Sequence, residues 1–182
     1  MRIPGLGGEV LARAGALPVS LPGGEIFTAL ATGAIDASEW VGPYNDLAFG
    51  LYEAAQYYYY PGWHEPGSTL ECIVNKAAYE VLPADLQAVV AQACAAVNDN
   101  MLAEFTARNG AALDTLLNQH GVQLRAFPAD VLKRLHALSD EVLADMAARD
   151  PAAKKIHASY QQFRKTVTAW HKVSEQAYYN AR

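Results

Sequence analysis

One apolar stripe with helical spacing, running from residue 83 to residue 121, limits what this chain can fold into more than any other feature. Its members recur every three or four positions, as on one face of an α-helix: Leu86, Val89, Val90, Ala93, Cys94, Val97, Met101, Phe105, Ala112, Leu113, Leu116 and Leu117. Pro83 suits the first turn of a helix, and Gly121 suits the residue just past its end. The stripe predicts one long helix, with or without a break at Asn109-Gly110.

The rest of the second half is also predicted to be mostly helical. A short strand is expected at 122–127 (VQLRAF), followed by a helix from Pro128 to about Arg149. Asp150-Pro151 then separates this helix from a last one that runs to the end of the chain, because proline cannot continue a helix from its N-terminal side. Residues 83–182 are therefore predicted to form a helical C-terminal part.

The first half has a different character, rich in glycine, proline and aromatic residues. Its predicted segments are a short helix at 9–15, a short buried strand at 17–21 (LPVSL), and a turn, helix, turn and strand over 23–38. The side chains expected to point inward are Ile26, Ala29, Leu30 and Ile35. Alternating short strands and helices are typical of α/β folds. Residues 1–82 are therefore predicted to form an α/β lobe with a mixed or parallel sheet.

Composition and charge exclude several classes of protein. The chain has 182 residues, of which 52% are hydrophobic, so it can build a core. Its formal net charge of -5 argues against a broad nucleic-acid surface, which would need clustered lysine and arginine. No run of 18 or more apolar residues is present to span a bilayer. Cys72 and Cys94 belong to no zinc-binding motif, and the sequence does not decide whether they pair.

No set of catalytic residues assembles from the sequence. The segment GLGGEV at 5–10 only approaches a dinucleotide-binding glycine motif, and no strand of useful length precedes it. The five histidines, His64, His120, His136, His157 and His171, are scattered and show no metal-ligand spacing. No nucleophile, base and oxyanion donor can be grouped. The residues alone therefore point to no particular catalytic chemistry.

Aromatic side chains and carboxylates concentrate in one region instead. Glu39 and Trp40 stand side by side before Gly42-Pro43, in a stretch (38–50) too rich in turn-formers for a strand or helix interior. Four tyrosines at 57–60 precede a Gly-Trp-His-Glu-Pro-Gly turn. On a strand two of these tyrosines would face a core and two a cleft or the surface. This combination suits a concave site for a small polar ligand.

Arg2 and Glu39 could have different roles in such a site, one toward a ligand carboxylate and the other toward a cation. An arginine just before Pro4-Gly5 could point into a cleft, where its guanidinium can grip a carboxylate with two hydrogen bonds. Glu39 would repel an anionic ligand but could reach it through a bound cation. A carboxylate oxygen and backbone carbonyls freed by a turn are the ligands that Na⁺ or Ca²⁺ prefers. Glu39-Trp40 is therefore predicted to form an elbow that binds a cation and a ligand.

Three segments, in order, carry a family resemblance: MRIPGLGGEV, GGEIFTALATGAIDASEWVGPYND and YYYYPGWHEPG. They resemble the substrate-binding proteins of tripartite ATP-independent periplasmic (TRAP) transporters of the DctP type, and most closely the subgroup that binds 2-oxo acids and related small carboxylates. The resemblance covers essentially the whole chain. It implies a periplasmic, two-lobed α/β binding protein that closes on a 2-oxo or 2-hydroxy monocarboxylate and delivers it to membrane permease subunits. A protein of this kind is not an enzyme.

The resemblance also implies roles for individual residues. Arg2 corresponds to the arginine that pairs with the ligand carboxylate. Glu39, through its side chain, and Trp40, through its carbonyl, correspond to residues that hold a Na⁺ or Ca²⁺ bridging to the ligand, while the Trp40 indole walls the pocket. Glu65 corresponds to a carboxylate in the second loop of the site, close to both ligand and metal. Family members are roughly twice this long, so a signal peptide and an N-terminal lobe are expected to precede Met1.

Two alternatives from other classes remain open. One is a small α/β enzyme acting on an oxo acid, against which stands the lack of a base and nucleophile set. The other is an interaction module whose helical half pairs with a second copy. Apolar and aromatic residues at helical spacing near the C-terminus keep a homodimer open: Ile156, Tyr160, Phe163, Val167, Trp170, Val173 and Ala177.

Overall fold

The computed structural model describes residues 1–182, and most of them are helical. The helices are α1 (Gly5–Arg13), α2 (Ile26–Ala31), α3 (Pro43–Ala48), α4 (Lys76–Glu80), α5 (Ala84–Asn118), α6 (Ala129–Arg149), α7 (Pro151–Val173) and α8 (Glu175–Asn180). Two strands, β1 (Tyr57–Tyr60) and β2 (Gln123–Ala126), and two single 3₁₀ turns, Gly23–Glu25 and Leu51–Glu53, complete the chain.

The strands pair in parallel, with Tyr57 opposite Gln123 and Tyr60 opposite Ala126. A second parallel arrangement forms at the N-terminus, where Arg2 bridges to Val19 on one side and to Ser38 on the other. The first residues of the chain thus lie between two later segments, both of which are short. The fold class is α/β with a small parallel sheet, as predicted.

The main core lies where α1 packs against α6. Its buried members are Val10, Leu135, Leu138 and Val142, and Trp63 packs against them from the loop after β1. Ile3, Ile26, Ala29 and Ile35 are buried near the N-terminus, so three of the four side chains predicted to point inward there do so. Gly33 lies just after the end of α2 and has a φ of +71°, a backbone conformation that favours glycine.

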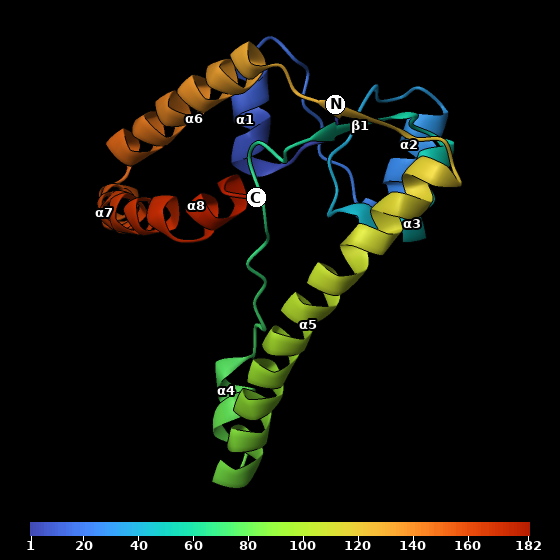
Figure 1. Ribbon diagram of the computed structural model, residues 1–182. Coiled ribbons are helices and arrows are strands. Elements are labelled where there is room, and N and C mark those ends of the chain that lie inside the picture. Colours follow the sequence, from blue (N-terminus) through green and yellow to red (C-terminus); the bar gives the residue numbers. More distant parts are fainter.

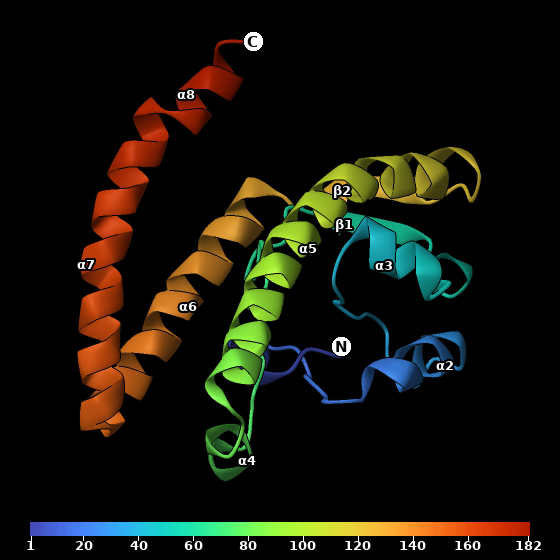
Figure 2. The ribbon, with the colours of Figure 1, turned by 90° about the horizontal axis from the view of Figure 1, so that it is seen from below.

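Helix α5 extends away from this body as an arm, with the short α4 at its far end (Figures 1 and 2). It is one continuous helix, so the break considered at Asn109-Gly110 is absent. Its only buried residues are Ala112 and Leu116. Val89 and Val97 are more than half exposed. The long helix was therefore predicted correctly. Its apolar stripe is largely exposed within this chain, because only α4 and the segment before it lie along the far part of the arm (Figure 1).

Three local predictions for the first half are wrong. The stretch 38–50 contains α3, because Pro43 at the first helical position supplies a helical φ and needs no hydrogen-bond acceptor. Helix α1 begins at Gly5 instead of residue 9. Residues 17–21 make no buried strand: Val19 forms a single bridge, and Leu17 is 84% exposed because nothing covers it.

Two further predictions need correction. Among the four tyrosines only Tyr58 is partly buried, and its hydroxyl donates to Asp46, while the other three are about half exposed. The last helix does not run unbroken to the end. It stops at Ser174, whose backbone leaves the helical region and whose hydroxyl donates to the Trp170 carbonyl at 2.9 Å. None of the helices is both long and apolar enough to cross a membrane.

Candidate functional site

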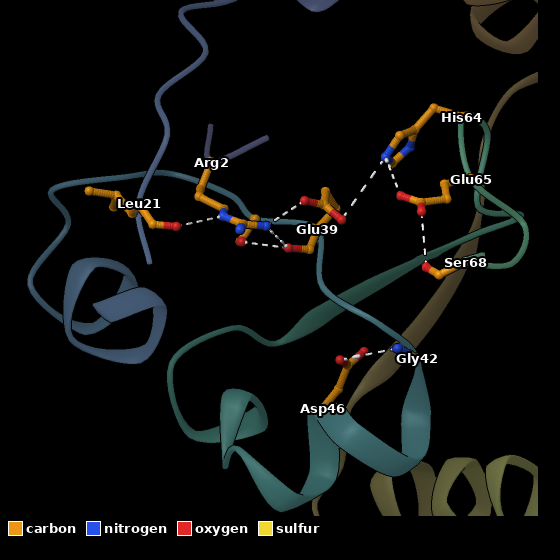
Figure 3. Close-up of polar contacts among 9 residues, drawn as sticks. Arg2, Leu21, Glu39, Gly42, Asp46, His64, Glu65 and Ser68 are labelled. Carbon is orange, nitrogen blue, oxygen red and sulfur yellow. Dashed lines mark hydrogen bonds and ion pairs between the residues drawn. The ribbon is translucent and has the colours of Figure 1, made fainter. Parts of the chain in front are cut away.

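Arg2 is held rigidly near the start of the chain. Its side chain is largely buried, and its Nε donates to the Leu21 carbonyl at 3.1 Å. Its Nη1 donates to the Glu39 carboxylate at 2.5 Å and to the Glu39 carbonyl at 3.3 Å (Figure 3). Nη2 has no hydrogen-bond partner within the chain. Two of the three guanidinium nitrogens thus fix the group, and the third stays free for a ligand.

Glu39 follows the Ser38 bridge and lies between the side chains of Arg2 and His64. Its backbone N–H donates to the Arg2 carbonyl at 3.3 Å, which fixes the strand-like segment that carries it. One carboxylate oxygen meets Arg2 Nη1, and the other lies 4.0 Å from His64 Nε2. Burial raises the pKa of Glu39, while the positive charges of Arg2 and His64 act in the opposite direction. The carboxylate is thus partly withdrawn from water and already oriented.

Trp40 forms a wall beside this ion pair. The Arg2 guanidinium carbon lies 5.4 Å from the centroid of the indole ring. Phe49 also packs against the indole, with the two ring centroids 5.2 Å apart. Gly23 allows the indole to approach closely, since a Cβ there would lie 2.5 Å from the ring. The Trp40 carbonyl accepts no hydrogen bond from the chain, so it is free to coordinate a cation.

The second loop of the site follows β1. Glu65 is half exposed and accepts a hydrogen bond from the Ser68 hydroxyl at 2.9 Å. His64 lies between the two carboxylates, with Nε2 3.9 Å from a Glu65 oxygen (Figure 3). Ligand atoms of Glu39, His64 and Glu65 all lie within 4.8 Å of one another. The structure therefore gathers all four residues predicted for the site and adds His64.

His64 was missed because the five histidines showed no metal-ligand spacing. The available signal was its position next to Glu65 in a rigid turn. Its closeness to Glu39 depends on how the two loops meet.

The donor set fits a hard cation. Two carboxylates that converge, with a free carbonyl close by, are the oxygen ligands that Na⁺ and Ca²⁺ prefer. The imidazole is a softer nitrogen ligand, better suited to transition metals. Its Nε2 lies 3.9–4.0 Å from both carboxylates, too far for a direct hydrogen bond to either. The oxygen atoms therefore determine the kind of ion that the cluster can hold.

A buried hydrogen-bond link joins the two loops behind the site. The Asp46 carboxylate accepts from the Gly42 N–H at 3.3 Å and from the Tyr58 hydroxyl at 2.5 Å. Asp46 lies on α3 and Tyr58 on β1, so the link fixes the Glu39-Trp40 elbow relative to the strand that leads to Glu65. Burial raises the pKa of Asp46, and hydrogen bonds from Tyr58 and Gly42 lower it.

A hollow of about 760 Å³ lies beside the cluster. Glu39, Trp63, His64 and Glu65 line one side of it, and residues of α1, α6 and α7 line the rest. Arg2 and Trp40 do not line it. The carboxylates of the cluster therefore face open space, while the Arg2–Trp40 pair forms a second side of the same site.

Comparison with known proteins connects this geometry to a family. Residues 1–150 match the family described as bacterial extracellular solute-binding protein, family 7 (DctP). The monocarboxylate 2-oxoacid-binding periplasmic protein of Nostoc sp. (strain PCC 7120) is 44% identical over 180 residues, which cover 99% of this chain and 49% of that protein. The chain thus spans about half the length of this relative.

Two solved structures share the fold closely, each with a TM-score of 0.94 over 100% of this chain. One is a TRAP periplasmic solute-binding protein from Pseudoalteromonas atlantica with bound sodium and pyruvate, 42% identical, of which this chain covers 55%. The other is a TRAP transporter solute-binding protein from Bordetella bronchiseptica, 37% identical and covered over 54%. It is described as a mixed-occupancy dimer with calcium and picolinate in one active site.

Proposed function

The chain belongs to the DctP family of bacterial extracellular solute-binding proteins, and from this membership we propose that it binds a small 2-oxo or 2-hydroxy monocarboxylate for a TRAP transporter. The family confirms the resemblance found in the sequence. It also confirms the prediction of a binding protein and not an enzyme, which leaves the oxo-acid enzyme without support. The names of the Nostoc relative and the Pseudoalteromonas structure support a 2-oxo acid such as pyruvate as the ligand.

The observation that carries the proposal is the Arg2–Glu39 pair. Arg2 is fixed through Nε and Nη1, so the free Nη2 edge is already oriented for a carboxylate. A preorganised donor loses little side-chain freedom when the ligand arrives. A guanidinium also presents its donors in a plane that matches a carboxylate, which a lysine ammonium does not.

A bridging cation would complete the site. Glu39, Glu65 and the Trp40 carbonyl would hold Na⁺ or Ca²⁺, and the ion would attract the ligand's carboxylate or keto oxygen past the negative charge of Glu39. Sodium and calcium in the two solved relatives support this choice of ions. Glu65 is the most exposed of the three, so it is the one that would adjust most to the ion.

The partners and location follow from the same family. A protein of this type would act in the periplasm and pass its ligand to the membrane permease subunits of a TRAP transporter. We also infer a homodimer through α7, on which large apolar side chains stay exposed. Phe163 and Trp170 are 66% and 64% exposed. The Bordetella structure, described as a dimer, supports this inference.

Calorimetric titration with pyruvate tests the ligand. Because this chain spans about half of its relatives, the titration compares the 182-residue chain with a chimera in which it replaces the matching residues of the Nostoc protein. The chimera should bind pyruvate in the presence of Na⁺ or Ca²⁺. Arg2→Lys should weaken binding by about 1.5–3 kcal/mol, the strength of a hydrogen bond to a charged group.

Arg13→Lys is the matched control. Arg13 also pairs with a carboxylate, Asp145, at 2.6 Å, but lies on α1 away from the site. Its conservative replacement should leave pyruvate affinity unchanged. Equal affinities of the wild-type and Arg2→Lys chimeras would remove Arg2 from the site, and a chimera that binds no 2-oxo acid would refute the proposed function.

A further inference from the structure

The only two cysteines of the chain lie together on the arm, outside the candidate site. Cys94 is on α5, and Cys72 is in the segment without regular structure between β1 and α4. Both are exposed. The Cys72 side chain contacts the Cys94 thiol and raises its pKa.

The packing around α4 explains why they meet. Gln87 on α5 donates to the carbonyls of Tyr79 and Leu82 at 3.2 and 2.9 Å, and the Tyr79 hydroxyl donates to the Gln87 carbonyl at 3.3 Å. These bonds fix α4 beside the first turns of α5. Cys94 lies two helical turns beyond Gln87 on the same face, about 10 Å along the axis.

The segment before α4 extends a similar distance along the arm. The four residue-to-residue steps from Cys72 to Lys76 span about 13 Å when the chain is extended. Figure 1 shows this segment leading from the body to α4 beside the arm, so it runs antiparallel to α5, and its residues before α4 lie progressively nearer the body. The Asn75 side chain caps α4 by accepting from the Ala78 N–H at 3.0 Å, which sets the direction in which the segment leaves the helix. The contact between the thiols thus follows from two anchored elements.

We propose that Cys72 and Cys94 form an intramolecular disulfide that ties the segment carrying Glu65 to helix α5. This inference rests on the proposed function for its compartment, since a periplasmic protein meets an oxidising environment in which disulfides persist. The cross-link would hold the otherwise irregular segment 61–75 at a point seven residues after Glu65. It would limit the conformations of the second site loop without touching the ligand.

The bond would form by exchange with a disulfide oxidant. One cysteine thiolate attacks a sulfur of the oxidant and releases one thiol, and the second cysteine then displaces the other. Two cysteine thiols are oxidised to one disulfide, the oxidant is reduced to two thiols, and the cysteine protons pass to the released thiolates. Exposure of both side chains gives the oxidant access.

Oxidation of the 182-residue chain with oxidised glutathione tests the proposal independently of ligand binding. After oxidation no thiol should be titratable in denaturant, and the intact mass should fall by two hydrogen atoms. A tryptic digest without reductant should join the peptide 14–76 to the peptide 77–108, because no lysine or arginine lies inside 14–75 or 77–107. In Cys72→Ser and Cys94→Ser the remaining cysteine should stay as a mixed disulfide with glutathione.

Hydrogen exchange then measures the effect on the site loop. Amides of residues 66–75 should exchange several-fold more slowly in the oxidised wild type than in the reduced protein, and oxidant should change nothing in the double serine variant. Two free or glutathione-bound cysteines in the oxidised wild type, or disulfides only between chains, would overturn the proposal. Such a result would leave pyruvate binding untouched, and a failure of pyruvate binding would leave the cross-link standing.

Discussion

Among the single residues, Glu39 has the most contacts with charged groups. It accepts a hydrogen bond from Arg2, faces His64 and lies near the Glu65 carboxylate. Two cationic side chains offset its charge, while burial and Glu65 disfavour it. A bound cation would add the positive charge that two neighbouring carboxylates need. Under the proposed function, Glu39 would therefore link the Arg2 guanidinium to the bound cation.

Glu39→Gln tests the cation at this residue, because glutamine keeps the size of the side chain and removes its charge. In the wild-type chimera, chelation of Ca²⁺ and replacement of Na⁺ should weaken pyruvate binding at least about tenfold, or ~1.4 kcal/mol. In the variant, calorimetry should find weak binding that no longer depends on the ion. Asp145→Asn, which removes a remote carboxylate, serves as the control and should keep the ion dependence. Identical binding by wild type and Glu39→Gln in ion-free buffer would exclude the bridging ion.

Asp46 is expected to make the free energy of unfolding depend on pH. Its carboxyl is buried, so its pKa in the folded protein lies above the ordinary value of 3.8. Between these two values the folded state binds more protons than the unfolded state, and the free energy of unfolding falls as pH rises. Asp46 therefore contributes more stability at acidic than at neutral pH.

Asp46→Asn should remove this contribution, because the amide does not titrate. Urea unfolding of wild type and variant between pH 7 and pH 4 should show the wild type gaining stability relative to the variant as pH falls. Taking the difference between the two proteins cancels other titrating groups, including Glu39. Parallel pH profiles would show that Asp46 does not titrate differently in the folded and unfolded states.

Among the elements, α3 depends most on a distant partner. No side chain of its own N-terminus caps it. Instead Asn109 of α5 accepts a hydrogen bond from the Tyr44 N–H at 3.0 Å, and Tyr44 packs edge-on against Phe105. The Glu39-Trp40 elbow leads directly into α3, so the arm helix also supports the site.

Asn109→Ala should therefore destabilise the protein by about 1 kcal/mol, the typical cost of losing an N-cap acceptor. Asn109→Asp keeps an acceptor at the positive end of α3 and should stay close to wild type. Asn100→Ala is the matched control: Asn100 is exposed on the same helix, so alanine should raise stability by a few tenths of a kcal/mol. Urea unfolding measures the free energy of unfolding of all three variants. An unchanged value for Asn109→Ala would show that α3 needs no cap from α5.

Elements with a strong local pattern could be predicted from the sequence, and those that depend on distant contacts could not. The apolar spacing of α5 and the prolines before α6 and α7 are local signals. Helix α3 was missed although Pro43 is a local signal for a helix start, and the acceptor at its N-terminus comes from Asn109, 65 positions away. In the candidate site, Arg2, Glu39, Trp40 and Glu65 were predicted from residue chemistry and family resemblance, and the structure brings them together. His64 was not, since its role depends on where two loops meet.

At the scale of the whole molecule, the chain buries few of its residues. Only 15 of 182 are buried, and the exposed apolar side chains gather on α5 and α7. Helix α7 is oriented with polar side chains, and not its largest aromatic ones, toward the rest of the chain. Polar side chains such as Gln161 and Arg164 are partly buried, and Arg164 approaches His136 of α6 at 3.3 Å. The aromatic stripe with Phe163 and Trp170 is largely exposed to solvent instead. Figure 2 shows α7 at the edge of the molecule, where a second copy can reach it.

A symmetric pair of α7 helices would cover this stripe, since a two-fold axis places the same surface on both subunits. Trp170→Glu would then bury a charge at the seam, at a cost of several kcal/mol. Size-exclusion chromatography with light scattering at micromolar concentration should find a dimer for the wild-type chimera and a monomer for this variant. Thr168→Glu adds the same charge on the opposite side of the helix and should remain a dimer. A wild-type chimera with the mass of one chain would instead mean that residues of the same chain cover the stripe, since so many large apolar side chains on one helix face need a partner surface.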